Sequence, residues 1–220
     1  MPKTKILVKI CGVTTLDQAI RIAELGTDAI GIISVEESPR YITPENKQRI
    51  FKVLKNQYPN IERVTVVKNQ SVDLIIKNFL GEANETVIQL HGDEDIYYCR
   101  ELKKRMPNTA IWKAFRIRTK KDIEYIKSFE KYIDAILLDS WNEETYGGSG
   151  KRIEFKNLEN LSFKKPWWIA GGVSIEWVDK IYEYLKPYGI DISSSVEFYP
   201  GLKDILKVEA LINKVKTFNT

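Results

Sequence analysis

Short runs of β-branched and aliphatic residues alternate along the chain with longer segments in which apolar residues recur every three or four positions. The short runs predict β-strands and the longer segments predict amphipathic helices. Eight strands are expected, at Ile6–Cys11, Ala29–Ile33, Ile61–Val67, Thr86–Leu90, Ala110–Phe115, Ala135–Leu138, Trp167–Ala170 and Ile190–Ser193. Helices are expected at Leu16–Leu25, Pro44–Gln57, Asp73–Phe79, Asp95–Arg105, Thr119–Phe129, Ser174–Leu185 and Lys203–Phe218.

Two helix starts have specific capping signals. Thr15 stands directly before Leu16 and is followed by Gln18, which predicts a capping box. Thr43 is followed by Pro44, and proline is favoured at the first position of a helix. These signals support helices that begin at Leu16 and Pro44.

Strand–helix alternation of this kind predicts a parallel sheet. Eight strands and about eight helices within 220 residues favour a closed (βα)₈ barrel over an open, doubly wound sheet. No linker or break in composition divides the sequence. We therefore expect one α/β domain, a (βα)₈ TIM barrel spanning residues 1–220.

The faces of the predicted strands indicate where a site would lie. Side chains two positions apart share one face of a strand. Polar and aliphatic residues occupy opposite faces near four strand ends, and inward polar groups at the carboxyl ends of strands form the usual active site of such barrels. The polar residues concerned are Lys9 and Cys11, Gln89 and His91, Asp139, and Asp191 and Ser193.

Composition narrows the possible partners. Charged residues make up 29% of the chain, the net charge is only +4, and the charges are interleaved along the predicted helices. This pattern predicts a solvated surface rather than a nucleic-acid groove. No apolar run is long enough to cross a membrane, no signal peptide is recognisable, and two isolated cysteines indicate a reducing compartment, so a cytoplasmic protein is expected.

Cys11 is the first candidate for chemistry. A free cysteine is commonly only a small buried apolar residue. Cys11, however, ends a strand, precedes Gly12 and shares a face with Lys9, whose ammonium group is expected to lower the pKa of the thiol. Cys99 lies in a helical segment without these features and is expected to be structural.

Asp139 and the glycine- and serine-rich segments are further candidates. A carboxyl group enclosed at a strand end is suited to general acid catalysis, although Asp139 is equally compatible with a helix cap. Loop N–H groups bind phosphate, and barrels often bind it after strands seven and eight. With one histidine in the chain, His91, a metal site has little support. The segments concerned are 147–151, 170–173 and 193–197.

Over nearly the whole chain, the sequence resembles the phosphoribosylanthranilate isomerase family of tryptophan biosynthesis. Seven motifs match in the family's order and at the expected strand ends. They are Lys-Ile-Cys-Gly at 9–12, Ser-Pro-Arg-Tyr-Ile at 38–42, Gln-Leu-His-Gly at 89–92, Leu-Leu-Asp-Ser at 137–140, Tyr-Gly-Gly-Ser-Gly-Lys at 146–151, Ala-Gly-Gly-Val at 170–173 and Asp-Ile-Ser-Ser at 191–194.

This resemblance implies an Amadori rearrangement of N-(5-phosphoribosyl)anthranilate without a metal or organic cofactor. It implies that Asp139 protonates the ribose ring oxygen and that Cys11, as a thiolate, removes the C2′ proton. Arg40 would hold the anthranilate carboxylate, because a guanidinium fork fits a carboxylate. The other implied contacts to this small phosphorylated substrate are Gln89, His91, Gly148, Gly171, Gly172, Asp191, Ser194 and Ser195. The 147–151 loop would close over the site.

One position departs from the family pattern Ser-Ser-Gly-Val-Glu, because Ser195 replaces the glycine. If the backbone at Ser195 is left-handed, serine would destabilise the loop by about 1–2 kcal/mol and weaken phosphate binding. If only a small N–H donor is required, serine costs little. The sequence leaves both possibilities open.

Two other functions remain as alternatives. The related histidine-pathway isomerase performs the same rearrangement, but its barrels resemble a duplicated half-barrel with an aspartate ending the first strand, where this chain has Cys11. A barrel that binds a phosphorylated ligand without turnover would not need both Cys11 and Asp139. Either a monomer or a homodimer is compatible with the sequence.

Overall fold

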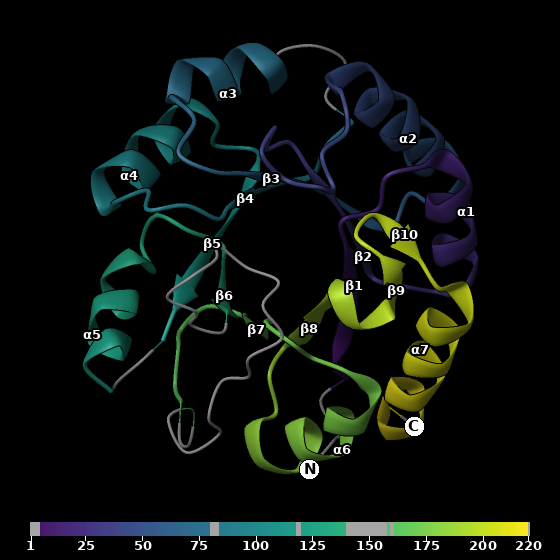
Figure 1. Ribbon diagram of the computed structural model, residues 1–220. Coiled ribbons are helices and arrows are strands. Elements are labelled where there is room, and N and C mark those ends of the chain that lie inside the picture. The colour runs from purple at the N-terminus through teal and green to yellow at the C-terminus, as the bar shows by residue number, and fades with distance from the viewer. Residues whose placement is uncertain (1–4, 80–83, 118–119, 140–157, 159–160, 220) are drawn as a thin grey trace.

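Eight parallel strands form a closed barrel in sequence order, surrounded by helices, in the computed structural model (Figure 1). The structure describes residues 5–79, 84–117, 120–139, 158 and 161–219. Every strand lies within one residue of its predicted ends, which confirms the (βα)₈ prediction. The strands are β1 (Leu7–Cys11), β2 (Ala29–Ile33), β3 (Glu62–Val67), β4 (Val87–Leu90), β5 (Ala110–Arg116), β6 (Ala135–Asp139), β7 (Trp167–Ile169) and β8 (Gly189–Ile192).

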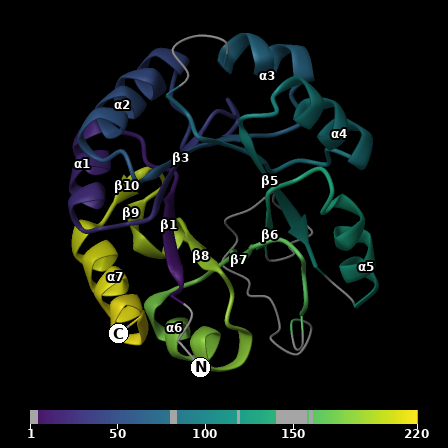
Figure 2. The same ribbon diagram turned by 180° about the vertical axis from the view of Figure 1, so that it is seen from behind.

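The ring closes between its first and last strands. β1 pairs with β8 in parallel, with Leu7 opposite Gly189 and Ile10 opposite Ile192. Figure 2 shows the same closed ring from behind, with α7 beside α1 where the chain returns to its start. The outer helices are α1 (Leu16–Glu24), α2 (Pro44–Gln57), α3 (Val72–Phe79), α4 (Ile96–Arg105), α5 (Lys120–Phe129) and α7 (Ile205–Asn219). The predicted N-cap Thr43 accepts a hydrogen bond from Asn46 N, with Pro44 at the first helical position.

The helix predicted at Ser174–Leu185 is not one regular α-helix. It consists of a 3₁₀ turn (Ile175–Trp177), the short α6 (Val178–Lys180) and a wide π turn (Ile181–Leu185). Lys186 N donates to Ile181 O at 3.0 Å, and Lys186 itself is left-handed with φ 47°. Aromatic and β-branched residues dominate this segment and have weak helix propensity, so packing between β7 and β8 decides its shape.

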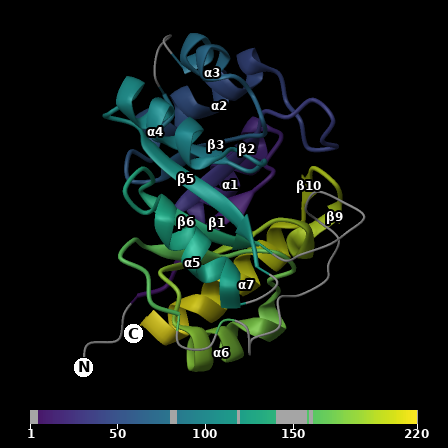
Figure 3. The ribbon, with the colours of Figure 1, turned by 90° about the vertical axis from the view of Figure 1, so that its left-hand side faces the viewer.

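The helix predicted at Lys203–Phe218 begins only at Ile205. The residues before it form an antiparallel hairpin of β9 (Glu197–Tyr199) and β10 (Leu202–Lys203). In the side view of Figure 3 this hairpin lies at the opposite end of the barrel from the C-terminal end of α7. The turn passes through Pro200 and Gly201, and Gly201 has φ 90°, a conformation that favours glycine.

The predicted capping box at α1 forms only in part. Thr15 accepts the expected hydrogen bond from Gln18 N at 3.3 Å. The Gln18 side chain, however, does not return to Thr15. Its amide donates to Gly201 O at 3.4 Å and accepts from Lys203 N at 3.1 Å. Gln18 therefore links the β9–β10 hairpin to α1, and Thr14 Oγ1 also donates to Gly201 O at 2.6 Å.

The barrel interior is filled by side chains on the face opposite the aliphatic outer layer. Val8 and Ile10 of β1 belong to the outer core beneath the helices, whereas Cys11 belongs to the inner cluster. Trp112 and Trp168 pack against each other inside the barrel, with ring centroids 4.9 Å apart and ring planes tilted by 31°. The predicted division of strand faces is confirmed, and the two indoles fill the interior beneath the polar strand ends.

Gly189→Ala is expected to lower the free energy of unfolding by about 1–3 kcal/mol. A methyl group at Gly189 would overlap the six-membered ring of Trp168, which is 1% exposed and held by its neighbours. Urea unfolding of the variant measures this, with Glu101→Ala on the exposed face of α4 as the control. An unchanged urea midpoint in Gly189→Ala would show that the interior can rearrange around the ring.

Candidate active site

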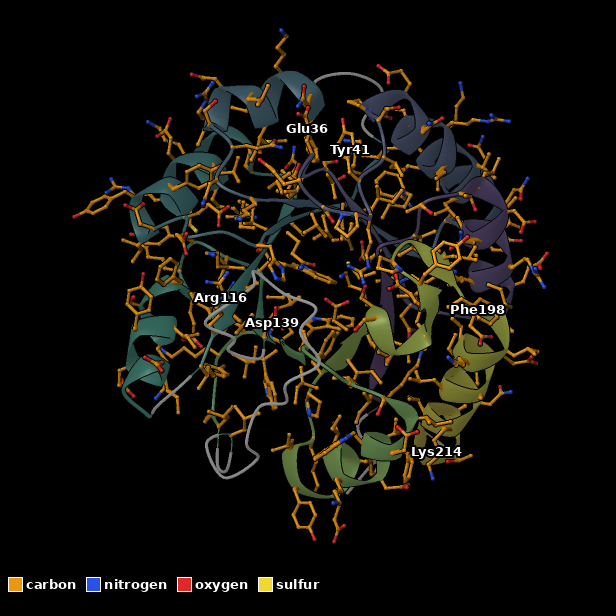
Figure 4. All side chains as sticks on the ribbon, viewed as in Figure 1. Glu36, Tyr41, Arg116, Asp139, Phe198 and Lys214 are labelled. Atoms are coloured by element: carbon orange, nitrogen blue, oxygen red, sulfur yellow. The ribbon has the colours of Figure 1, made fainter. Side chains whose placement is uncertain are left out.

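One cavity of about 690 Å³ opens at the carboxyl ends of the strands. Every predicted site residue that the structure describes lines it, although these residues come from six of the eight strands or the loops that follow them. They are Cys11, Arg40, Gln89, His91, Asp139, Gly171, Gly172, Asp191, Ser194 and Ser195. The remaining predicted contact, Gly148, and the 147–151 loop lie outside the described residues. In Figure 4 Asp139 lies inside the ring of helices, on the inner side of Arg116.

Cys11 ends β1 above a buried ion pair. Lys9 Nζ lies 2.8 Å from Asp191 Oδ1, and the lysine is completely buried. A methyl group at Gly31 would lie 2.8 Å from Cys11 Sγ and 3.1 Å from Lys9 Nζ, so glycine leaves room for both groups.

Lys9 lowers the pKa of the Cys11 thiol as expected, but the rest of the environment reverses the net shift. Burial raises the pKa of the Cys11 thiol, the Lys9 ammonium partly offsets this, and the Asp191 carboxylate raises it further. The net pKa is therefore raised rather than lowered. Asp191 holds the lysine charge, which leaves desolvation of the thiolate as the largest effect.

Asp139 ends β6 and belongs to a chain of hydrogen bonds. His91 Nε2 lies 3.0 Å from Asp139 Oδ2, and His91 Nδ1 lies 2.9 Å from Gln89 Nε2. Asp139 and Gln89 are buried, whereas His91 is partly exposed to the cavity. The three side chains form one hydrogen-bonded chain that links β4 to the end of β6.

The loops after β7 and β8 form another part of the cavity wall. Gly171 and Gly172 have φ values of 78° and 73°, which favour glycine. Ser195 is not left-handed: among the described residues other than glycine, positive φ occurs only at Asn69 and Lys186. Ser195 Oγ donates to Val173 O at 2.5 Å, which links the two loops. The strain considered for Ser195 is therefore absent, and its hydroxyl group has a structural partner.

Arg40 reaches the cavity from the β2–α2 loop and is held by a residue of the hairpin. Its Nη2 and Nε lie 2.7 and 2.9 Å from the two carboxylate oxygens of Glu197. Lys203 Nζ lies 2.7 Å from the same carboxylate. Gly12 allows this packing, because a methyl group there would lie 2.5 Å from Arg40 Cδ. One carboxylate therefore serves two buried or half-buried cations.

Metal-binding clusters and membrane-spanning helices are both absent from the described part of the chain. No group of three or more histidine, cysteine, aspartate or glutamate side chains is placed to hold a metal ion there. No described helix is long and apolar enough to cross a membrane.

The sequence matches the family model of N-(5′-phosphoribosyl)anthranilate (PRA) isomerase over residues 8–214. An N-(5′-phosphoribosyl)anthranilate isomerase of Crocosphaera subtropica is 41% identical over 212 residues, covering 96% of this chain and 99% of that protein. The chain belongs to the phosphoribosylanthranilate isomerase family.

Solved structures of phosphoribosylanthranilate isomerases have the same fold. The Thermotoga maritima enzyme gives a TM-score of 0.85 at 29% identity, with 96% of this chain and 99% of that chain covered. Another, solved with reduced 1-(o-carboxyphenylamino)-1-deoxyribulose 5-phosphate, gives a TM-score of 0.78 at 29% identity over the same shares of the two chains. The chain thus shares both sequence and barrel architecture with these isomerases.

Within this isomerase barrel, sequence reasoning missed the partners of Arg40. The sequence places Glu197 only in a serine-rich segment and predicts Lys203 at the start of a helix. The dipeptide Pro200–Gly201 was the available signal, because Pro-Gly marks a turn and places the residues on either side of it on paired strands. It could not have shown that the hairpin would lie against Arg40.

Glu197→Gln is expected to destabilise this isomerase by about 3–5 kcal/mol at neutral pH, because it leaves two buried cations without a counter-charge. Burial opposes ionisation of Glu197, but the hydrogen bonds from Arg40 and Lys203 outweigh it and hold the pKa of Glu197 below its ordinary value. The stabilisation that ionised Glu197 gives the folded state is therefore fully present above pH 4.5, the ordinary pKa of a glutamate. It is lost as the pH falls through the lowered pKa of Glu197 in the folded protein.

Urea unfolding of both proteins across this pH range measures the effect. The difference in stability between the unmutated chain and Glu197→Gln should shrink as the solution is acidified. Glu101→Gln on the exposed surface of α4 is the matched control. A difference that stays constant with pH would show that the Glu197 charge does not stabilise the hairpin.

Proposed function

We propose that this chain converts N-(5′-phosphoribosyl)anthranilate to 1-(2-carboxyphenylamino)-1-deoxyribulose 5-phosphate in tryptophan biosynthesis, with Asp139 as general acid and Cys11 as general base. The observation that carries the proposal is the single cavity that both residues line, from β6 and β1 respectively. These strands are far apart in the ring, so the two groups can act on different atoms of one bound sugar.

The proposed reaction moves protons only. Asp139 gives a proton to the ribose ring oxygen, the C1′–O bond breaks, and the substrate nitrogen supplies the electron pair that forms a protonated Schiff base. Cys11 as thiolate then takes the C2′ proton, and that electron pair returns to nitrogen to give an enolamine. Protonation at C1′ and loss of the C2′ hydroxyl proton give the ketone. The substrate nitrogen serves as electron sink, so the proposal requires no metal or organic cofactor.

The rest of the cavity supplies binding groups. Arg40 would hold the anthranilate carboxylate, and Glu197 fixes the orientation of the guanidinium group through its Nε and Nη2. The phosphate would lie against the loops after β7 and β8, where Gly172, Ser194 and Ser195 line the cavity. Gln89, His91, Gly171 and Asp191 lie near the sugar in this arrangement, and Gly148 would belong to the loop that covers it.

The proposal also covers the state of the protein in the cell. We take residues 1–220 as one catalytic domain that acts in the cytoplasm as a monomer or a homodimer, without nucleic acid or membrane partners. The Thermotoga maritima isomerase is dimeric, and monomers have been generated from it. Both cysteines of this chain are free thiols, which suits a reducing compartment.

The test is a fluorescence assay with the substrate generated in place from anthranilate and phosphoribosyl pyrophosphate. The purified protein should accelerate the loss of substrate fluorescence with no metal added. The histidine-pathway substrate, assayed alongside, should not be consumed. A folded protein that leaves the fluorescence decay at the blank rate would refute the proposal, and binding without decay would favour the non-catalytic alternative.

Ser195→Gly is expected to leave the Michaelis constant unchanged or to raise it, because Ser195 carries no left-handed strain that glycine could relieve. The variant loses the hydrogen bond to Val173 O, so the free energy of unfolding should fall by about 1 kcal/mol. Steady-state kinetics and thermal unfolding measure the two effects. A lower Michaelis constant in Ser195→Gly would contradict this interpretation of the loop.

A further inference from the structure

The nitrogen and the oxygen of the Gln89 side-chain amide differ in their hydrogen bonding. Its Nε2 lies 2.9 Å from His91 Nδ1, whereas its Oε1 is buried without a hydrogen-bond partner in the described part of the chain. Gln89 is completely buried on β4, inside the barrel. An unpaired buried carbonyl is costly, and the two ends of a primary amide have nearly the same size. The side chain can therefore occupy this place in two orientations.

The orientation of the amide fixes which ring nitrogen of His91 carries a hydrogen. In the present orientation the amide NH₂ donates to Nδ1, so Nδ1 is unprotonated and Nε2–H donates to the carboxylate of Asp139. When the Asp139–His91 pair takes up one more proton, His91 becomes an imidazolium ion, or Asp139 becomes a carboxylic acid that donates to Nε2. Both forms place a hydrogen on Nδ1. A donor cannot face a donor, so the amide must turn and present Oε1.

We propose that Gln89 and His91 are positioning residues that supply Asp139 with the proton it donates to the substrate. The Gln89 amide selects the His91 tautomer, and His91 passes its bound proton to Asp139. This rests on the proposed function, in which Asp139 gives up a proton in every turnover. The His91 side chain is 24% exposed and that of Asp139 only 8%, so His91 is the member of the pair that solvent reaches more easily. Turning the amide gives Oε1 a partner and moves the NH₂ group to the place that Oε1 leaves.

The charges around this unit are largely paired. Lys113 Nζ lies 3.0 Å from Glu94 Oε2, and Arg116 Nη1 lies 4.0 Å from Asp93 Oδ1. Asp122 on α5 lines the cavity on one side of His91 and Asp139, and Lys68 after β3, Cys11 and Asp191 line the cavity on the other side. Asp191 is paired with the buried Lys9. The direct contacts of the His91 ring are its hydrogen bonds to Gln89 and Asp139, and we assign the position of the proton to these two contacts.

The chain contains only one histidine, which gives a direct experiment. In protein labelled with ¹⁵N-histidine, the two ring resonances of His91 report which nitrogen carries the hydrogen, without substrate. For the ligand-free protein at a pH where the ring is neutral, we expect the hydrogen predominantly on Nε2. Gln89→Leu should give a mixture of tautomers, and Gln89→Glu should keep hydrogens on both nitrogens to a higher pH. Gln57→Glu on the exposed surface of α2 is the matched control.

Kinetics then separate a positioning role from a substrate contact. Gln89→Leu should lower kcat by roughly 10-fold or more and change KM by less than about threefold. The alkaline limb of the kcat–pH profile should move to higher pH in Gln89→Glu, because the added carboxylate stabilises the protonated form of the His91–Asp139 pair. His91→Gln keeps a donor near Asp139 but cannot carry the extra proton, and should lose about as much kcat as Gln89→Leu.

Three results would overturn the proposal. One is the same tautomer ratio in the unmutated chain and in folded Gln89→Leu. Another is an alkaline limb of the kcat–pH profile that does not move in Gln89→Glu. The third is a raised KM with kcat retained in Gln89→Leu, which would show that the two residues contact the substrate instead. If the unmutated chain does not isomerise the substrate, the proposed function fails, while the ligand-free resonances still decide whether Gln89 sets the His91 tautomer.

Discussion

Replacing Asp139 by asparagine is expected to lower kcat by roughly 10²- to 10⁴-fold while KM changes little. Asparagine has the same shape and can still accept the hydrogen bond from His91 Nε2, which is 3.0 Å away in the unmutated chain. It cannot hold an acidic proton for the ribose ring oxygen, so opening of the sugar loses its catalyst. The fluorescence assay under saturating and limiting substrate measures the two constants.

A matched Asp→Asn change distinguishes the lost acid from a general effect of the substitution. Asp17 lies on α1 and is exposed, with only a long ion pair of 4.0 Å to Arg21. Asp17→Asn should keep both kcat and KM. An Asp139→Asn protein that stays folded and retains kcat within about tenfold would show that another group protonates the sugar.

Cys11→Ser is expected to cause a loss of similar size, roughly 10²- to 10⁴-fold in kcat, since a hydroxyl group ionises far less readily than a thiol. The change removes little volume, so unfolding should show only a small loss of stability. Cys99 of α4 is the matched control: it is buried outside the cavity, and burial raises its pKa to about 12. Cys99→Ser should lower stability and leave kcat unchanged.

Alkylation by iodoacetamide gives a second measurement on Cys11. The thiolate is the reactive form, and burial together with Asp191 outweighs Lys9 and raises the pKa of Cys11. In the free enzyme the rate of inactivation should therefore keep rising with pH beyond the range of an ordinary thiol, and product should slow it. Full activity in Cys11→Ser, or alkylation of Cys99 as the inactivating event, would make Cys11 a packing residue.

The sequence was sufficient for the fold because the evidence for each strand is local. Alternation of side chains along Ala135–Asp139 needs only the neighbouring residues, and it places Asp139 and Leu137 inward and Ile136 and Leu138 outward. Eight such strands separated by amphipathic helices leave few arrangements that bury every apolar face. The carboxyl ends of parallel strands meet at one end of the barrel, so the candidate site residues also converge.

The sequence failed where a contact between distant segments decided the outcome. Pro200 and Gly201 mark a turn, but the backbone groups of Gly201 and Lys203 find their partners in Thr14 and Gln18, about 185 residues earlier in the chain. The local pattern around Lys203 is compatible with a helix start. Propensity is weak in a short segment, and tertiary hydrogen bonds override it.

What the sequence determined by itself was the barrel, the end of the barrel that holds the site and ten of the residues that line the cavity. Tertiary structure decided how those residues behave. Burial of the Cys11 thiol and the Asp191 carboxylate bound to Lys9 outweigh the lowering effect of Lys9, so the pKa of Cys11 is raised rather than lowered. Ser195 adopts an ordinary backbone conformation, which the sequence had left open. Periodicity specifies which face a side chain occupies, but ionisation and strain depend on burial and on partners that only the closed barrel brings together.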